Sequence, residues 1–259
     1  MSKALLITGT TRGMGREFAR DAARRSYYIH LLNRSEDDNF ENELMSLGAA
    51  GVRYWICDLS QPKDVGAFLD KFQKEVSSLD VIFNNAGMLE AGSYSEISFE
   101  KEKQLFELNY HTPIQIIKSL LPLILSSPKP LIINNASVLS KLPLPFTAAY
   151  NSSKAALVSY TNSLRMELYG KARVVQLITP GVATELFYKV ETEYNRKMKF
   201  SFFPVISGEK WSNHVWRSID KGEKREINSS FFTQVGIWLY FFFPKLMEWT
   251  FSHKKAGLQ

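Results

Sequence analysis

Short apolar runs alternate along the chain with longer segments of helical periodicity. The runs lack the polar–apolar alternation of a strand with one wet face, so we expect strands that helices cover on both sides. The candidate strands span 4–8, 27–32, 52–57, 81–85, 131–135 and 174–179. Helix-length segments between them include 13–25, 62–77 and 99–125. This pattern predicts an α/β protein with a doubly wound parallel sheet.

No Gly/Ser-rich linker and no internal repeat divides the chain. A helix candidate at 208–221 and a short strand candidate at 225–228 complete a predicted sheet of about seven strands. Residues 1–230 are therefore predicted to form one Rossmann-type domain. Within it, residues 185–221 are predicted to cover the substrate, because ligands of such sheets lie beyond the carboxyl ends of the strands.

The C-terminal tail, residues 231–259, departs from this pattern. Its segment 231–243 is apolar on every face and is followed by Pro244. A helix of this length is about 20 Å long, shorter than the roughly 30 Å hydrocarbon layer of a bilayer. Two interpretations remain open: a helix buried in the core or in a subunit interface, and a monotopic membrane anchor with aromatic residues at the headgroups and lysines near anionic lipid. The residues concerned are Trp238, Tyr240, Trp249, Lys245, Lys254 and Lys255.

The composition is that of an ordinary globular protein. The 259 residues carry a formal net charge of +6, but the basic residues are scattered, so we expect no nucleic-acid partner. The single cysteine, Cys57, excludes an internal disulfide framework, and the four histidines show no metal-ligand spacing. Because only three residues precede the first candidate strand, we expect no N-terminal signal or anchor and a cytoplasmic protein, at most peripheral on a membrane.

The stretch TGTTRGMG follows the first candidate strand and opens the first candidate helix. Its glycines, Gly9, Gly13 and Gly15, let the backbone turn tightly and approach a pyrophosphate. The free N–H groups of the following helix face the negative charge. This position within an α/β pattern favours a dinucleotide-binding site over a simple tight turn.

The same stretch resembles the TGxxxGxG fingerprint of the short-chain dehydrogenase/reductase family, and further landmarks of that family follow in order. They are NNAG at 84–87, Asn109 in ELNYH, Ser137 in NNASV, YNSSK at 150–154 and the pair Pro180 and Gly181. The resemblance implies an enzyme that moves a hydride between a nicotinamide cofactor and a carbonyl or alcohol. It also implies a homodimer or homotetramer that pairs through the helices predicted at 99–125 and 147–169.

The charge pattern after the second candidate strand predicts the cofactor. An enzyme that prefers NAD holds the ribose 2′-hydroxyl with a carboxylate there, whereas a 2′-phosphate needs a cation. This chain has Asn33 and Arg34 at the strand end and Arg12 in the glycine loop, so two guanidiniums are available to clamp a phosphate. NADP(H) is therefore predicted, although the acidic residues 36–38 lie close by and are interpreted as the first turn of the next helix.

The resemblance implies the remaining cofactor contacts. Asp58 should meet the adenine amino group, with a strand-end cap as the alternative role, and the NNAG turn should pass beneath the adenosine ribose. Thr184 should bond the nicotinamide carboxamide. The predicted cofactor-binding residues are Gly9, Thr11, Arg12, Gly13, Met14, Gly15, Asn33, Arg34, Asp58, Leu59, Asn85, Ala86, Gly87, Tyr150, Lys154, Pro180, Gly181, Val182 and Thr184.

Tyr150 and Lys154 are one helical turn apart among small residues, so their polar groups can converge. By itself this spacing is also that of a surface tyrosine beside a solvated lysine. Carbonyl reduction needs a proton donor, and a free tyrosine has a pKa near 10, which a neighbouring ammonium lowers. We therefore predict that Tyr150 is the proton donor and that Lys154 lowers its pKa.

Two further residues complete a predicted catalytic set. Ser137 follows the fifth candidate strand and is predicted to hydrogen-bond the substrate oxygen, with a strand-end cap as the alternative. Asn109 resembles the asparagine with which the family positions a water for the lysine, with a polar residue inside a helix as the alternative. Catalytic residues are thus predicted to be Asn109, Ser137, Tyr150 and Lys154.

The predicted substrate is a hydrophobic ketone or aldehyde, lipid-, sterol- or retinoid-like if the tail binds a membrane. Aromatic residues after Thr184 supply candidate pocket walls, although packing within the fold is an equal alternative. They are Phe187, Tyr188, Phe200, Phe202 and Phe203. Two other functions stay open: an NAD(P)-dependent alcohol dehydrogenase that works in the oxidative direction, and a nucleotide-binding, membrane-associated scaffold without turnover.

Overall fold

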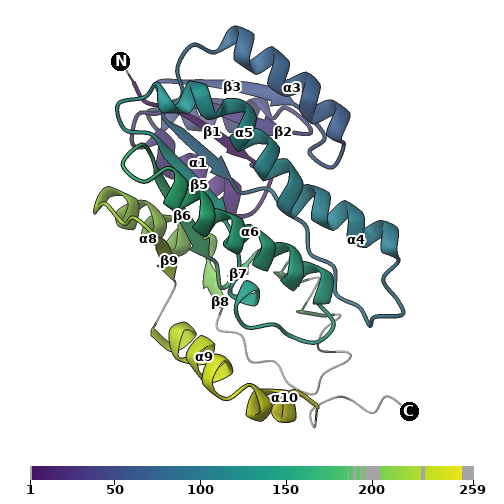
Figure 1. Ribbon diagram of the computed structural model, residues 1–259. Coiled ribbons are helices and arrows are strands. Elements are labelled where there is room, and N and C mark those ends of the chain that lie inside the picture. The colour runs from purple at the N-terminus through teal and green to yellow at the C-terminus, as the bar shows by residue number, and fades with distance from the viewer. Residues whose placement is uncertain are drawn as a thin grey trace.

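A seven-stranded parallel sheet, in the order β3-β2-β1-β4-β5-β6-β9, forms the centre of this computed structural model (Figure 1). The structure describes residues 2–185, 187–188, 191–192, 195, 205–228 and 231–252. The strands are β1 (Ala4–Thr8), β2 (Tyr28–Asn33), β3 (Gly51–Ile56), β4 (Val81–Asn84), β5 (Leu131–Asn135), β6 (Arg173–Ile178) and β9 (Glu226–Asn228). A separate parallel pair joins β7 (Gly181–Ala183) to β8 (Val205–Ser207). The predicted fold class is confirmed.

Alternate residues of each strand feed two hydrophobic layers, as a sheet covered on both faces requires. On one face, Leu5 and Ile7 pack with α1 (Met14–Ala23), α2 (Asp38–Ser46) and α8 (Gly208–Asp220). On the other, Leu6 packs with α3 (Pro62–Glu75), α5 (Thr112–Leu125) and α6 (Ala148–Glu167). Figure 1 shows these two groups of helices on opposite sides of the strands.

The strand order reverses between β1 and β4, which lie side by side with Leu5 opposite Val81. A doubly wound sheet opens a crevice at such a point, beyond the carboxyl ends of its strands. The ends of β1, β2, β4, β5 and β6 therefore meet at one edge, where the sequence places its glycine loop and its asparagine-rich strand ends.

Two predicted segments differ from the structure. The helix predicted over 99–125 is α4 (Phe99–Phe106), a π-helical turn η1 (Glu107–His111) and α5 in succession. The predicted substrate-covering insertion, 185–221, is too long. Its part from 208 to 220 is α8, a core helix whose Trp211, Val215 and Trp216 are fully buried in the layer that contains Phe18.

The C-terminal tail forms α9 (Phe231–Phe242) and α10 (Pro244–Ser252), with Pro244 as the first residue of the second helix. A proline fits a helix start because its missing N–H has no intrahelical partner there. No helix in the described part of the chain is both long and apolar enough to cross a bilayer. Figure 1 shows both helices at the lower end of the molecule, below β8.

Candidate active site

The glycine loop between β1 and α1 approaches neighbouring backbone so closely that side chains are excluded. Gly9 has a φ of +72°, and a Cβ there would lie 2.8 Å from Ala86 Cα. A Cβ on Gly15 would lie 2.0 Å from the carbonyl oxygen of Gly9. The N-cap of α1 is Gly13, which supplies no side-chain hydrogen bond to the first turn. The N–H groups of this turn are therefore available to an anion.

A cavity of about 580 Å³ lies over this loop and the carboxyl ends of the strands. Nearly all of the predicted site residues line it. They are Gly9, Thr11, Arg12, Gly13, Met14, Gly15, Asn33, Arg34, Asp58, Leu59, Asn85, Ala86, Gly87, Ser137, Tyr150, Lys154, Pro180, Gly181, Val182, Thr184 and Phe187. Asn109 and Tyr188 are the predicted site residues that do not line it.

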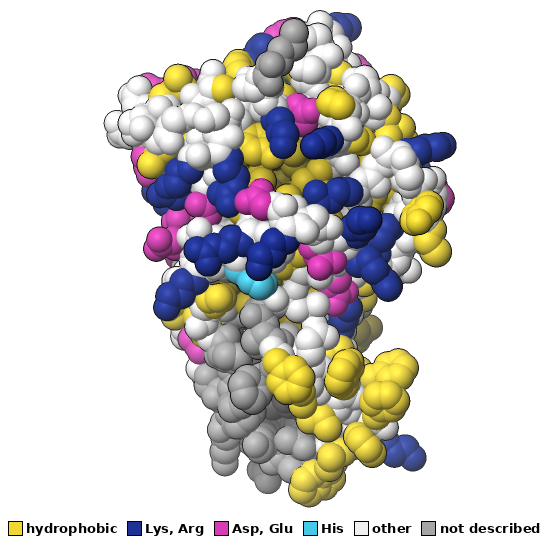
Figure 2. Space-filling model, turned by 90° about the vertical axis from the view of Figure 1, so that its left-hand side faces the viewer, with side chains coloured by type: hydrophobic (Ala, Val, Ile, Leu, Met, Phe, Trp, Pro, Cys, Tyr) yellow, Lys and Arg dark blue, Asp and Glu magenta, His cyan; other side chains and the backbone are white. Residues whose placement is uncertain are grey.

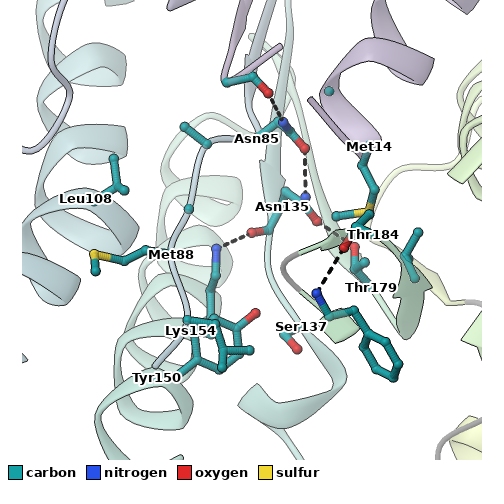
Figure 3. A pocket seen from close by; sticks show the side chains of 18 of the residues that line it. Met14, Asn85, Met88, Leu108, Asn135, Ser137, Tyr150, Lys154, Thr179 and Thr184 are labelled. Atoms are coloured by element: carbon teal, nitrogen blue, oxygen red, sulfur yellow. Dashed lines mark hydrogen bonds between the residues drawn. The ribbon is translucent and has the colours of Figure 1, made fainter. Parts of the chain in front are cut away.

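A chain of side-chain hydrogen bonds crosses the floor of the cavity from β1 to β6 (Figure 3). Asn85 Nδ2 donates to the carbonyl oxygens of Thr8 and Gly9, at 3.0 and 3.1 Å. Asn135 Nδ2 donates to Asn85 Oδ1 at 3.0 Å, and Thr179 Oγ1 donates to Asn135 Oδ1 at 2.5 Å. The sequence analysis missed Asn135 and Thr179. The NN doublet that ends both β4 and β5 was the available signal.

Lys154 reaches the same network from α6. Its Nζ donates to the carbonyl oxygen of Asn135 at 2.8 Å, and its side chain is only 4% exposed. Burial lowers the pKa of Lys154 to about 8. Gly87 keeps room in front of the amine, because a Cβ on Gly87 would lie 3.4 Å from Nζ.

Tyr150 and Ser137 face the same part of the cavity (Figure 3). Burial raises the pKa of Tyr150, and the hydrogen bond with the Ser137 hydroxyl acts in the opposite direction. In this geometry desolvation of the phenolate outweighs the Ser137 hydroxyl, and the lowering of the Tyr150 pKa by Lys154 stays a prediction. The phenol is held in its protonated form.

Ser137 forms the strand-end cap that was its alternative role, and its hydrogen bond to the substrate oxygen stays a prediction. Its Oγ accepts the N–H of Leu139 at 3.2 Å and so caps a short 3₁₀ turn, η2 (Val138–Ser140), directly after β5. The same hydroxyl hydrogen-bonds Tyr150 and lowers the pKa of the phenol, so Ser137 and Tyr150 act on each other within the cavity.

Asn109 is fully buried beneath the cavity, in the π-helical turn η1. Its amide pairs with the backbone of Met88 in both directions, each at 2.9 Å, and donates to Ser153 Oγ at 3.1 Å. The side chain thus fastens the segment after β4, next to Gly87 and behind Lys154. π-helical turns recur at functional sites, and this one places Asn109 under the predicted catalytic pair.

The end of β2 forms the far edge of the cavity. Asn33 is buried and is tied to the glycine loop: its Oδ1 accepts the N–H of Thr10 and its Nδ2 donates to Thr10 Oγ1, both at 2.7 Å. Arg34 is exposed. Arg12 also lines the cavity and pairs with Glu185, which lines it too, at 2.9 Å. Two guanidiniums therefore border the cavity, and their role as a phosphate clamp stays a prediction.

Asp58 follows β3 and turns its Oδ1 onto the backbone N–H and the hydroxyl of Ser60, at 2.9 and 2.8 Å. These bonds lower the pKa of Asp58. The alternative role as a strand-end cap is thus realised, and the residue also lines the cavity. Thr184 lies beside the glycine loop, and its Oγ1 accepts the N–H of Phe187 at 3.2 Å.

The end of the cavity near Tyr150 is mostly apolar. Phe187 lines it, as predicted, whereas Tyr188 is exposed and packs edge-to-face on Phe187. The predicted walls Phe200, Phe202 and Phe203 lie outside the described residues. Sequence reasoning missed the apolar walls from other segments, which are Met88, Leu89, Leu108, Val138, Leu139 and Leu144.

Known proteins resemble the chain in sequence and in structure. It is 27% identical to the ketoacyl reductase HetN of Nostoc sp. over 73% of this chain and 67% of that protein. It is also 27% identical to the 11-beta-hydroxysteroid dehydrogenase A of Sesamum indicum over 96% of this chain and 74% of that protein. The structure of an alcohol dehydrogenase from Thermococcus sibiricus, complexed with 5-hydroxy-NADP, superposes with a TM-score of 0.75 at 24% identity, covering 88% of this chain and 96% of that one.

The family model described as short chain dehydrogenase matches residues 3–195, which span the glycine loop, Ser137, Tyr150 and Lys154. That range holds every strand whose carboxyl end lines the cavity, together with the predicted catalytic residues. The chain therefore belongs to the short-chain dehydrogenase/reductase family of oxidoreductases.

Proposed function

We propose that this protein is an NADPH-dependent reductase of hydrophobic ketones or aldehydes. The observation that carries the proposal is that Tyr150, Ser137 and Lys154 line the same cavity as the glycine loop, two guanidiniums and a group of apolar side chains. One cavity thus offers a proton donor, an apolar wall and an anion-binding loop. This combination suits a nicotinamide cofactor and a carbonyl substrate.

The residues present fit a dinucleotide phosphate. A side chain at Gly9 or Gly15 would fill the space that a phosphate needs at the glycine loop. The first turn of α1 has no side-chain cap, so its N–H groups are available to the phosphate. Arg12 and Arg34 favour a 2′-phosphate at the end of β2. The L-sorbose reductase of Gluconobacter frateurii, which matches in fold at 20% identity and a TM-score of 0.75, was solved with NADPH and L-sorbose.

When bound, the reduced nicotinamide supplies the hydride to the carbonyl carbon. We assign the remaining chemistry to the chain's own groups. The Ser137 hydroxyl donates to the substrate oxygen and holds it as negative charge develops, and the Tyr150 phenol transfers its proton to that oxygen. The Lys154 ammonium then stabilises the phenolate, while its bond to Asn135 fixes its position.

The proposed substrate is apolar around its carbonyl group. Six aliphatic or thioether side chains and the ring of Phe187 surround the space next to Tyr150, and burial of apolar substrate surface against them favours binding. The names of the relatives, a ketoacyl reductase and a steroid dehydrogenase, fit this substrate class.

A carbonyl panel tests the proposal. Purified protein with NADPH is expected to reduce long-chain or polycyclic ketones and aldehydes in preference to short polar ones, and Tyr150→Phe to lower kcat by about a hundredfold or more. NADPH binding should survive in this variant. Turnover only of alcohols with NAD(P)⁺ would favour the oxidative alternative, and tight NADPH binding without turnover of any substrate would favour the scaffold.

We also propose a peripheral contact between the tail and a membrane. One side of α9 packs on the body, where Ile237 joins the cluster of Ala136, Val158 and Ile178. The other side is an apolar surface that stays exposed, with Trp238 at 57% and Phe241 at 76%. This surface, named here the tail patch, consists of Trp238, Leu239, Phe241, Phe242, Phe243, Leu246 and Trp249.

Three observations favour a lipid surface as the partner of the tail patch. Its helices are too short to span a bilayer and are broken at Pro244, which suits helices that lie in the interface. Aromatic residues dominate it, as in membrane-interface belts. Figure 2 shows many Lys and Arg side chains, with fewer Asp and Glu among them, on the face above the yellow cluster at the lower end, and this excess of positive charge would attract anionic headgroups.

Sedimentation with anionic vesicles tests this contact. The full chain is expected to pellet with phosphatidylserine-containing vesicles, and the variant Trp238→Ser/Phe241→Ser to stay in solution. The matched control is Tyr94→Ser/Tyr169→Ser, which removes two aromatic rings that are 93% and 88% exposed elsewhere on the molecule. Equal pelleting of both variants would refute the proposal. It would also be refuted if the parent protein did not bind vesicles and Trp238→Ser/Phe241→Ser changed the subunit number, because the tail patch would then be a subunit interface.

A further inference from the structure

An ion pair lies directly beside the proposed 2′-phosphate end of the cavity. Arg16, in the first turn of α1, reaches Asp37, the N-cap of α2, with 2.7 Å between Nη1 and Oδ2. Asp37 follows Asn33 by four positions, in the loop that leaves β2. It is therefore an acid in the region where a carboxylate selects the 2′-hydroxyl of NAD.

The carboxylate of Asp37 is held away from the main cavity, which it does not line. Its Oδ1 accepts the N–H of Phe40 at 3.0 Å, and its backbone carbonyl accepts the hydroxyl of Tyr54 at 3.0 Å. The hydrogen bond from Arg16 is the main cause that lowers the pKa of Asp37. The acid thus stays ionised, with its charge matched by a guanidinium.

Arg16 is itself held rigidly. Its guanidinium lies 3.8 Å from the centre of the Phe40 ring, and Phe40 is buried. The same guanidinium donates to the carbonyl oxygen of Thr11 at 3.4 Å. Arg16 therefore connects the glycine loop, which carries Arg12, to the β2–α2 loop, which carries Arg34.

A second, smaller cavity of about 220 Å³ adjoins this ion pair. Thr11 and Asn33 line both cavities, so the two adjoin at the end of β2. Asp37 lines only the smaller one. If Asp37 had no cationic partner, its carboxylate would repel a phosphate bound at the neighbouring edge of the main cavity, because like charges in a partly enclosed site repel strongly.

We propose that Arg16 is a positioning residue that determines cofactor choice: it neutralises Asp37 and joins the two loops that carry Arg12 and Arg34, so that this edge accepts a 2′-phosphate despite its acidic residues. The inference rests on the proposed NADP(H) site. It concerns nucleotide binding alone and is independent of the substrate and of the chemistry at Tyr150.

Calorimetric titration of the full chain with NADPH and with NADH, without substrate, tests the proposal. Arg16→Met is expected to weaken NADPH binding by about tenfold or more, a loss of about 1.4 kcal/mol or more, and NADH binding by less than about threefold, a loss of less than about 0.7 kcal/mol. Adding Asp37→Asn to Arg16→Met should restore most of the NADPH affinity, and asparagine keeps the N-cap of α2. Arg16→Lys should recover only part of the preference, because it keeps the charge but loses the stacked, forked guanidinium that joins the two loops.

Equal weakening of both nucleotides by Arg16→Met, or no recovery in the double variant, would show that Arg16 is only structural. Asp37→Asn alone supplies a second test if Arg16→Met does not fold. It should change NADPH affinity by less than about twofold, since Asp37 is already neutralised, and a tenfold gain would overturn the inference. Failure of the parent protein to bind either nucleotide would instead refute the proposed cofactor.

Discussion

At the scale of single residues, burial of the Lys154 amine changes both the pKa of this group and the stability of the fold. It is almost fully enclosed, and its pKa of about 8 lies well below the ordinary value of a lysine. The helical spacing of Tyr150 and Lys154 was enough to predict that both side chains face the same cavity. The raised pKa of Tyr150 was not predictable, because desolvation depends on side chains from distant segments.

Substitution of Lys154 tests this burial through stability. In the folded protein the lysine stays charged only below about pH 8, whereas in the unfolded chain it stays charged to about pH 10.5. Burial of the cation therefore lowers the free energy of unfolding of the parent by its full amount below pH 8. This loss of stability becomes smaller as the pH rises from 8 to 10.5. Lys154→Met should lack that pH dependence.

We expect the free energy of unfolding of the parent, relative to Lys154→Met, to rise by about 3 kcal/mol between pH 7 and pH 10.5. Urea unfolding of both proteins at the two pH values measures this difference. The loss of the bond to Asn135 in the variant affects both pH values alike. A difference that is independent of pH would contradict a lowered pKa for Lys154.

At the scale of elements, the sequence pattern predicted the six main strands and α1, α3 and α8, because buried strands and amphipathic helices have distinct periodicities. It did not predict the π-helical turn at Glu107–His111, whose backbone register has no signature in apolar spacing. The segment 208–221 was also predicted to be part of a substrate cover. That assignment missed the packing of Trp211 and Trp216, because tertiary burial decides the role of a tryptophan.

A pair of tryptophan substitutions distinguishes core helix α8 from tail helix α9. Trp216 is fully buried, and its Nε1 donates to the carbonyl oxygen of Phe18 at 3.2 Å. Trp216→Ala should lower the free energy of unfolding by about 3–5 kcal/mol. Trp238→Ala, on the exposed face of α9, should change it by less than about 0.5 kcal/mol. Chemical denaturation checks both values, and a large loss in Trp238→Ala would show that the tail patch is buried in solution.

At the scale of the whole molecule, the sheet order brings five strand ends to one edge and so builds the site. Residues 8, 85, 135 and 179 lie at or just after the ends of four strands that are distant in sequence, and the order β1-β4-β5-β6 makes them a continuous hydrogen-bond network. The family motifs identified Asn85 as a site residue, but not Asn135, Thr179 or these contacts. The predicted dimer or tetramer and the contact of the tail with lipid stay predictions.

The most direct test of the central claim is deuterium transfer from NADPH that is labelled at the reactive carbon of the nicotinamide. With a ketone selected from the carbonyl panel, the product alcohol should carry the deuterium on the former carbonyl carbon. The rate of its formation should fall by about a hundredfold or more in Tyr150→Phe while NADPH still binds. Labelled product formed equally fast by Tyr150→Phe, or no labelled product from the parent protein with any carbonyl compound, would contradict the account.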